Sequence, residues 1–103
     1  MDLEAHLIQK LAPDRFRTSG KFHAILAHLL HQKWVTPSIV SLSVTSDGFL
    51  IARDEERGYD GGGRFLGTAA ALRKNIAGME RDGIITTAER QHLLGRVPVY
   101  GNG

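Results

Sequence analysis

The chain of 103 residues is 42% hydrophobic and 23% charged, which is typical of a globular domain and excludes a disordered polymer. It contains no cysteine, so disulfide scaffolds, thiolate zinc sites and cysteine nucleophiles are excluded. Charge is unevenly spread: residues 37–63 carry two basic and five acidic side chains, whereas the segments before and after are net positive. This pattern favours self-association or a partner with complementary charge.

Length and hydropathy set the organisation that we expect. One domain is predicted over residues 1–100, followed by a tail at 101–103, because single domains cluster near 100–150 residues. The chain has no apolar run of the about 20 residues that a membrane-spanning helix needs, and its start lacks the basic residues of a signal peptide. We therefore expect a cytoplasmic protein that does not enter membranes, with no cofactor and no metal.

Two helices are predicted in the N-terminal third. Apolar residues recur at helical spacing over residues 3–11, and Pro13 ends that pattern. Thr18 and Ser19 are candidate N-caps of a second helix. The apolar stripe of this second helix consists of Phe22, Ile25, Leu26 and Leu29.

The periodicity then changes from helix to strand. Residues 40–45 alternate apolar with hydroxyl side chains, the turn Ser46-Asp47-Gly48 follows, and residues 49–53 form the returning strand. A two-stranded hairpin is marginal alone, so helices must cover one of its faces or a second copy must extend the sheet.

Two further helices are predicted after the glycine-rich connector at residues 54–63. The first starts at Arg64 and the second runs over residues 87–94, while Asp82-Gly83 separates them as a helical hairpin. Residues 96–100 could add a short edge strand. The fold class is therefore α+β: two N-terminal helices, one β-hairpin and two C-terminal helices.

The leading functional hypothesis is a non-catalytic protein-interaction or regulatory module that acts as a homodimer. Either the hairpin extends a shared sheet or a heptad-like seam pairs the third helix with another copy. The seam that defines this interface consists of Phe65, Ala69, Leu72, Ile76 and Met79. Because the seam is only about two heptads long, the alternative is that this stripe faces the chain's own core or pairs with an antiparallel helix. The partner would be a second copy or an unidentified protein.

A second hypothesis is nucleic-acid binding by the C-terminal helical hairpin as a helix-turn-helix. Thr86, Thr87, Arg90 and Gln91 would begin the recognition helix, and the phosphate contacts would come from Arg73, Lys74, Arg81 and Arg96. The low net charge of +2 and the carboxylate of Glu89 weaken this hypothesis.

A third hypothesis is anion or small-ligand binding at Gly61, Gly62, Gly63 and Arg64, where backbone amides and a guanidinium precede a predicted helix. The order of residues does not match a P-loop, because no Lys-Ser or Lys-Thr follows the glycines. The dinucleotide fingerprint also fails, because Leu66 stands where its last glycine would be.

The segment 78–89 matches part of a calcium-binding loop, but Gly78 stands where the first ligand should be. A capping box of Thr86 and Glu89 explains the same residues without a bound metal. The run Asp82-Gly83-Ile84-Ile85-Thr86, with Leu72, Glu89 and Leu93-Leu94, resembles a short helical module often found at the C-termini of bacterial proteins. That resemblance implies a role in oligomerisation or partner docking.

Histidines and serines give no stronger signal. His28 and His31 share a helix face, but no carboxylate completes a ligand set in that helix, so a solvated face is the simpler interpretation. The serines lack the surroundings of a nucleophile elbow. We therefore assign no catalytic residue and lean against an enzyme.

Overall fold

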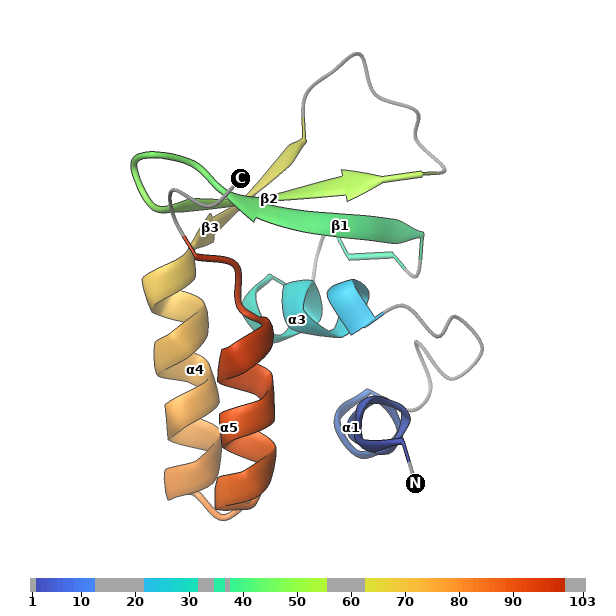
Figure 1. The fold of residues 1–103 in the computed structure, drawn as a ribbon, viewed down its shortest axis with the longest axis vertical. Coiled ribbons are helices and arrows are strands. Elements are labelled where there is room, and N and C mark those ends of the chain that lie inside the picture. The colour runs from blue at the N-terminus through green and yellow to red at the C-terminus, as the bar shows by residue number, and fades with distance from the viewer. Residues whose placement is uncertain (1, 13–21, 32–34, 37, 56–62, 100–103) are drawn as a thin grey trace.

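The computed structural model describes residues 2–12, 22–31, 35–36, 38–55 and 63–99. Along the chain these form α1 (Leu3–Leu11), α3 (Phe22–Leu30), β1 (Ile39–Val44), β2 (Phe49–Asp54), β3 (Arg64–Thr68), α4 (Ala69–Arg81) and α5 (Thr87–Arg96). The α+β fold class is confirmed, with both N-terminal helices, the hairpin and both C-terminal helices present (Figure 1). The caps predicted at Thr18 and Ser19 and the tail at 101–103 lie outside the described residues.

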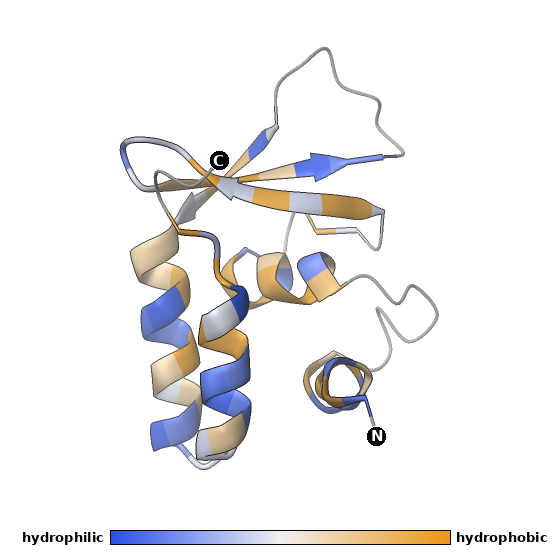
Figure 2. Cartoon of the chain, viewed as in Figure 1, coloured by the Kyte–Doolittle hydropathy of each residue, from blue (hydrophilic) through white to orange (hydrophobic). Residues whose placement is uncertain are grey.

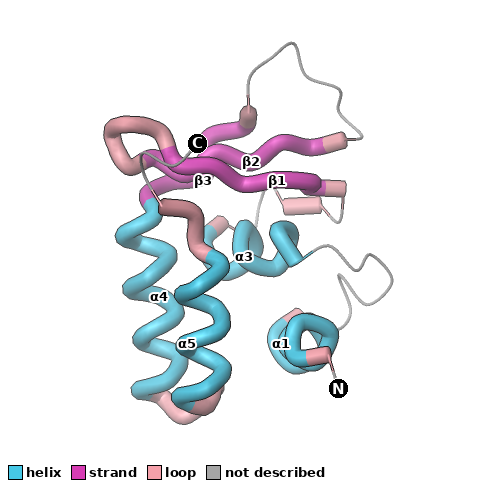
Figure 3. Tube along the Cα trace, viewed as in Figure 1, coloured by secondary structure: helices cyan, strands magenta, loops and turns pink. Residues whose placement is uncertain are grey.

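The described elements form two layers. The antiparallel sheet has the order β1-β2-β3, and the four helices lie on one side of it (Figure 1; Figure 3). Between the layers lies a single hydrophobic core. Its largest fully buried side chains are Leu7, Ile25, Leu26, Val35, Ile39, Leu50, Leu72, Ile76 and Leu93. No described helix is both long and apolar enough to cross a membrane.

The hairpin of β1 and β2 forms where the alternating pattern predicts it. Leu42 pairs with Ala52 and Val44 with Leu50, so these four side chains face the helices. Gly48 closes the turn with φ +84, a conformation that L side chains rarely adopt. The strand β2 extends to Asp54, whose buried carboxylate accepts hydrogen bonds from Thr36 and Ser38 at 2.8 and 2.5 Å.

The prediction of a helix starting at Arg64 is wrong, because residues 64–68 form a third strand. Phe65 pairs with Ile51 and Gly67 with Leu50, which leaves Leu66 as the extra residue of a β-bulge. Gly67 has φ +147, which no helix contains, and Thr68 then caps α4 by accepting a hydrogen bond from the Ala71 amide. The sheet therefore has three strands instead of the two that we expected.

The helical hairpin is confirmed, but its C-terminal end differs from the prediction. α4 ends at Arg81, Asp82 is its C-cap, and Gly83 turns the chain with φ +80. α5 extends two residues past the predicted end at Leu94, to Arg96. The edge strand predicted at 96–100 is wrong for its described part: Arg96 is helical and residues 97–99 pair with no strand. Pro98, which has no amide hydrogen to donate to a sheet, lies within this segment.

Candidate interaction surface

The outer edge of β1 is the longest regular backbone that the described residues leave unpaired. β1 has six residues and pairs only with β2, because the described sheet begins with it. The Thr45 amide donates to the Phe49 carbonyl, which fixes the alternation of the hairpin. By that alternation Leu42 and Val44 direct their N–H and C=O groups away from β2. Two residues thus offer two donors and two acceptors to another strand.

The composition of β1 does nothing to protect this edge. Its sequence Ile-Val-Ser-Leu-Ser-Val has no charge and no proline, the two commonest devices against edge-to-edge pairing. Figure 2 shows the contrast, since β1 has no strongly hydrophilic segment whereas β2 and β3 do. The opposite edge, β3, is shorter and carries Arg64 and the bulge at Leu66, whereas the irregularity of β1 lies at its start, between Ile39 and Ser41. β1 is therefore the edge better suited to strand addition.

The sheet face turned away from the helices carries an aromatic pair. Phe49 and Phe65 contact each other edge to face, with ring centroids 5.1 Å apart, and they are 38% and 57% exposed. Ser43, on the same face of β1, is also exposed. Because Phe49 belongs to β2 and Phe65 to β3, this pair lies towards the β3 edge of the sheet and not at the β1 edge.

Most of the seam predicted as a helix-to-helix interface lies inside the chain's own core. Ala69, Leu72 and Ile76 are at most 3% exposed and pack within the hydrophobic core. Met79 is partly buried against that core, and Phe65 lies on the outer sheet face instead of on a helix. Only Phe65 of the five remains well exposed.

The glycine-rich anion site is only partly described. Gly61 and Gly62 lie outside the described residues, and Gly63 and Arg64 lead directly into β3 instead of a helix. A Cβ atom at Gly63 would collide with Cγ2 of Ile51 and come within 3.1 Å of the Ala52 carbonyl oxygen. The close passage of the chain beside β2 explains this glycine without a bound anion, and anion binding stays a prediction.

Three of the side chains predicted to contact nucleic acid have carboxylate partners within the chain. Thr87 donates to Glu80 at 2.6 Å, and Arg90 Nε lies 2.7 Å from the same carboxylate. Arg96 pairs with Glu4 and lies over the Phe22 ring, 4.8 Å from its centroid. In addition, α4 and α5 pack side by side instead of crossing steeply (Figure 1).

The remaining members of that set are distributed over several faces. Thr86 caps α5 through its hydroxyl, and Arg73 reaches the Pro98 carbonyl at 3.5 Å. Gln91 is exposed on α5. Lys74 and Arg81 line a groove between α4 and the C-terminal ends of α1 and α3. Nucleic-acid binding stays a prediction that no described contact favours.

Glu89 is the centre of the strongest polar cluster. Its side chain is 7% exposed, and Oε1 accepts hydrogen bonds from Lys10 Nζ at 2.7 Å and from the Thr86 amide at 2.8 Å. His6 Nε2 lies 2.8 Å from Oε2. The hydrogen bonds from Lys10 and Thr86 outweigh the opposing effect of burial and lower the pKa of Glu89 from 4.5 to about 2.

This arrangement confirms the capping box and adds a function that the local pattern did not predict. The Thr86 hydroxyl accepts from the Glu89 amide at 3.1 Å, while the Glu89 carboxylate accepts from the Thr86 amide. Because Lys10 and His6 belong to α1, the same carboxylate also attaches the N-terminal helix to α5. Glu89 is thus occupied by partners within the chain, as a capping box predicts and a calcium ligand would not be.

The comparisons with known proteins add no identity. Protein-family models, curated proteins and solved structures give no match to this chain. The candidate function therefore rests on the geometry of the sheet alone.

Proposed function

We propose that this chain is a non-catalytic interaction module in which two copies join along their β1 edges to form one continuous antiparallel sheet. The observation that carries the proposal is the edge itself: six residues, uncharged, free of proline and at the end of the described strand order. Strand addition of this kind gains affinity from main-chain hydrogen bonds, and a twofold axis makes the same edge serve both copies.

The alternation of β1 determines a register for this pairing. The N–H and C=O groups of Leu42 and Val44 point outward, so a twofold axis at Ser43 places Leu42 opposite Val44 of the second copy. Four backbone hydrogen bonds then form across the axis. On the helix side, Leu42 and Val44 contact their equivalents and extend the hydrophobic core, while the two Ser43 side chains face each other at the closest approach of the strands.

A charge exchange at Ser43 tests this arrangement. Ser43 is exposed on the outer face, so lysine or glutamate is expected to leave the protomer folded. We expect the wild-type chain to sediment as a dimer, whereas S43K alone and S43E alone sediment as monomers because like charges lie directly opposite each other. An equimolar mixture of S43K and S43E is expected to restore the dimer. Analytical ultracentrifugation at about 100 μM measures all four samples.

The matched control is S46K, which adds the same charge to an exposed residue in the turn beyond β1. This variant is expected to remain dimeric. A wild-type chain that is monomeric at this concentration, or an S43K variant as dimeric as S46K, contradicts the proposal. Circular dichroism of each variant confirms that dissociation does not come from unfolding.

A further inference from the structure

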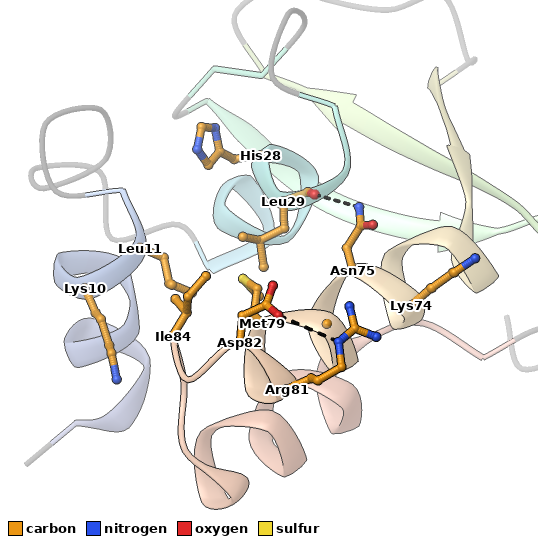
Figure 4. Close-up of a pocket in the computed structure, with 11 residues that line it drawn as sticks. Lys10, Leu11, His28, Leu29, Lys74, Asn75, Met79, Arg81, Asp82 and Ile84 are labelled. Carbon is orange, nitrogen blue, oxygen red and sulfur yellow. Dashed lines mark hydrogen bonds and ion pairs between the residues drawn. The ribbon is translucent and has the colours of Figure 1, made fainter.

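A groove lies on the helical side of the molecule, away from the β1 edge. It has a volume of about 590 Å³, is open to solvent, and is lined by the C-terminal ends of α1 and α3, the second half of α4 and the turn that follows α4. This volume is within the range of small-molecule sites. Figure 4 shows its apolar side chains gathered on one side, and these are Leu11, Leu29, Met79 and Ile84.

The other side of the groove carries the cations Lys74 and Arg81, together with the carboxylate of Asp82. Lys74 and Arg81 are seven residues apart on α4, two helical turns, and therefore lie on the same face of the helix. The one described acidic partner of Arg81 is Asp82, with Nε 3.7 Å from Oδ1, and these side chains are 79% and 62% exposed. Such an exposed, long ion pair is worth little, so a better placed carboxylate can replace it.

Two contacts fix the position of α4 and of the Arg81 guanidinium in the groove. Asn75 donates from Nδ2 to the Leu29 carbonyl oxygen at 3.0 Å, which ties α4 to α3 across the groove (Figure 4). Gly78 lies between Lys74 and Arg81, and a Cβ atom there would be 3.3 Å from Nη2 of Arg81. The guanidinium therefore lies against the bare helix backbone. A glycine within a helix is unfavourable on its own, and here it makes room for the cation.

We infer that this groove binds a small amphiphilic carboxylate, with its apolar chain against Leu29, Met79 and Ile84 and its carboxylate at Arg81, while Lys74 adds positive charge on the same face of α4. An arginine fork holds a carboxylate through two parallel hydrogen bonds, which favours this head group over a neutral one. The apolar wall favours a chain of several carbons over acetate. The inference concerns a different face from the proposed dimer edge and is independent of it.

Titration of the ¹⁵N-labelled full-length chain with octanoate, below the concentration at which octanoate forms micelles, tests the inference. We expect saturable shifts of the amides of Leu29 and of residues 75–82. Acetate and 1-octanol are expected to bind at least tenfold more weakly, because each lacks one of the two groups that the groove contacts. Equal binding of 1-octanol, or shifts from acetate as large as those from octanoate, contradicts the inference.

Variants separate binding from folding. R81A is expected to weaken octanoate binding at least tenfold. G78A is expected to have a smaller effect, because its methyl group would lie 3.3 Å from Nη2 of Arg81 and the guanidinium need shift only slightly, while the helix becomes easier to form. R73A is the matched control, since it removes an equal charge from the same helix at a residue outside the groove. Equal affinity of R81A and R73A for octanoate overturns the assignment of the carboxylate site.

Discussion

Replacement of Glu89 by alanine is expected to lower the free energy of unfolding by about 2–3 kcal/mol, measured by urea denaturation. The shift of its pKa from 4.5 to about 2 corresponds to about 3 kcal/mol at neutral pH. Solvent screening around Lys10 and His6, which are 33% and 41% exposed, reduces this figure, and loss of the helix cap adds to it.

The same carboxylate predicts the acid sensitivity of the fold. Because the pKa of Glu89 is lower in the folded chain, its contribution is fully present above the unfolded value of 4.5 and is lost as pH falls from about 5 to 2. E89Q is expected to flatten this part of the stability profile. The control is E80A, which removes a more exposed carboxylate from the neighbouring helix and is expected to cost less than about 1 kcal/mol. Equal losses for E89A and E80A would contradict the central role of Glu89.

Substitution of Gly63 by alanine is expected to cost about 2 kcal/mol of stability, because the added methyl group overlaps Cγ2 of Ile51. Thermal or urea unfolding measures the loss. If Gly63 served only to bind an anion, its substitution by alanine would lower the stability much less. The result therefore also distinguishes a packing role of Gly63 from the anion site predicted at residues 61–64.

A double-mutant cycle with I51A isolates the cause of that loss. I51A removes the Cγ2 atom that the new methyl group would meet, so G63A is expected to cost at least about 1 kcal/mol less in the I51A background. The contact of the new Cβ atom with the Ala52 carbonyl oxygen, at 3.1 Å, remains in the I51A background. It accounts for the part of the stability loss that I51A does not relieve. Strictly additive losses would show that the close passage beside Ile51 is not what requires glycine.

Local signals in the sequence were sufficient for elements whose ends are set by neighbouring residues. The turn at Gly48, the helix end at Asp82-Gly83 and the capping box of Thr86 and Glu89 all form as predicted. Each depends on one turn geometry or one pair of hydrogen bonds within a few residues, so no distant part of the chain can override it.

The third strand was missed because β3 runs into α4 with no connecting loop. Phe65 lies four residues before Ala69, so helical spacing continues across the boundary although Phe65 belongs to the strand. Gly67, with φ +147, and the cap at Thr68 mark the boundary. The pairing of Phe65 with Ile51 makes this segment a strand instead of a helix. This pairing is a tertiary contact, so the periodicity of one segment cannot predict it.

Self-association stays a prediction, and most of the seam that was expected to carry it on the third helix is buried in the chain's own core. The alternation of charge along the chain suggested self-association, and an extended sheet was one of the two arrangements expected. Which strand lies at the edge depends on strand order, and that order follows from the addition of β3 beside β2. The buried seam on α4 is apolar because α4 packs against α3 and α5, as most amphipathic helices face their own core.

Amide hydrogen exchange at Leu42 and Val44 tests the proposed dimer edge most directly. These two N–H groups point away from β2, so in an isolated protomer they exchange much faster than the amides of Ser41 and Ser43, which face β2. If two copies pair along β1, exchange at Leu42 and Val44 slows as the protein concentration rises from about 5 to 500 μM, while Ser41 and Ser43 change little. Fast exchange at both residues that is independent of concentration would contradict the proposal.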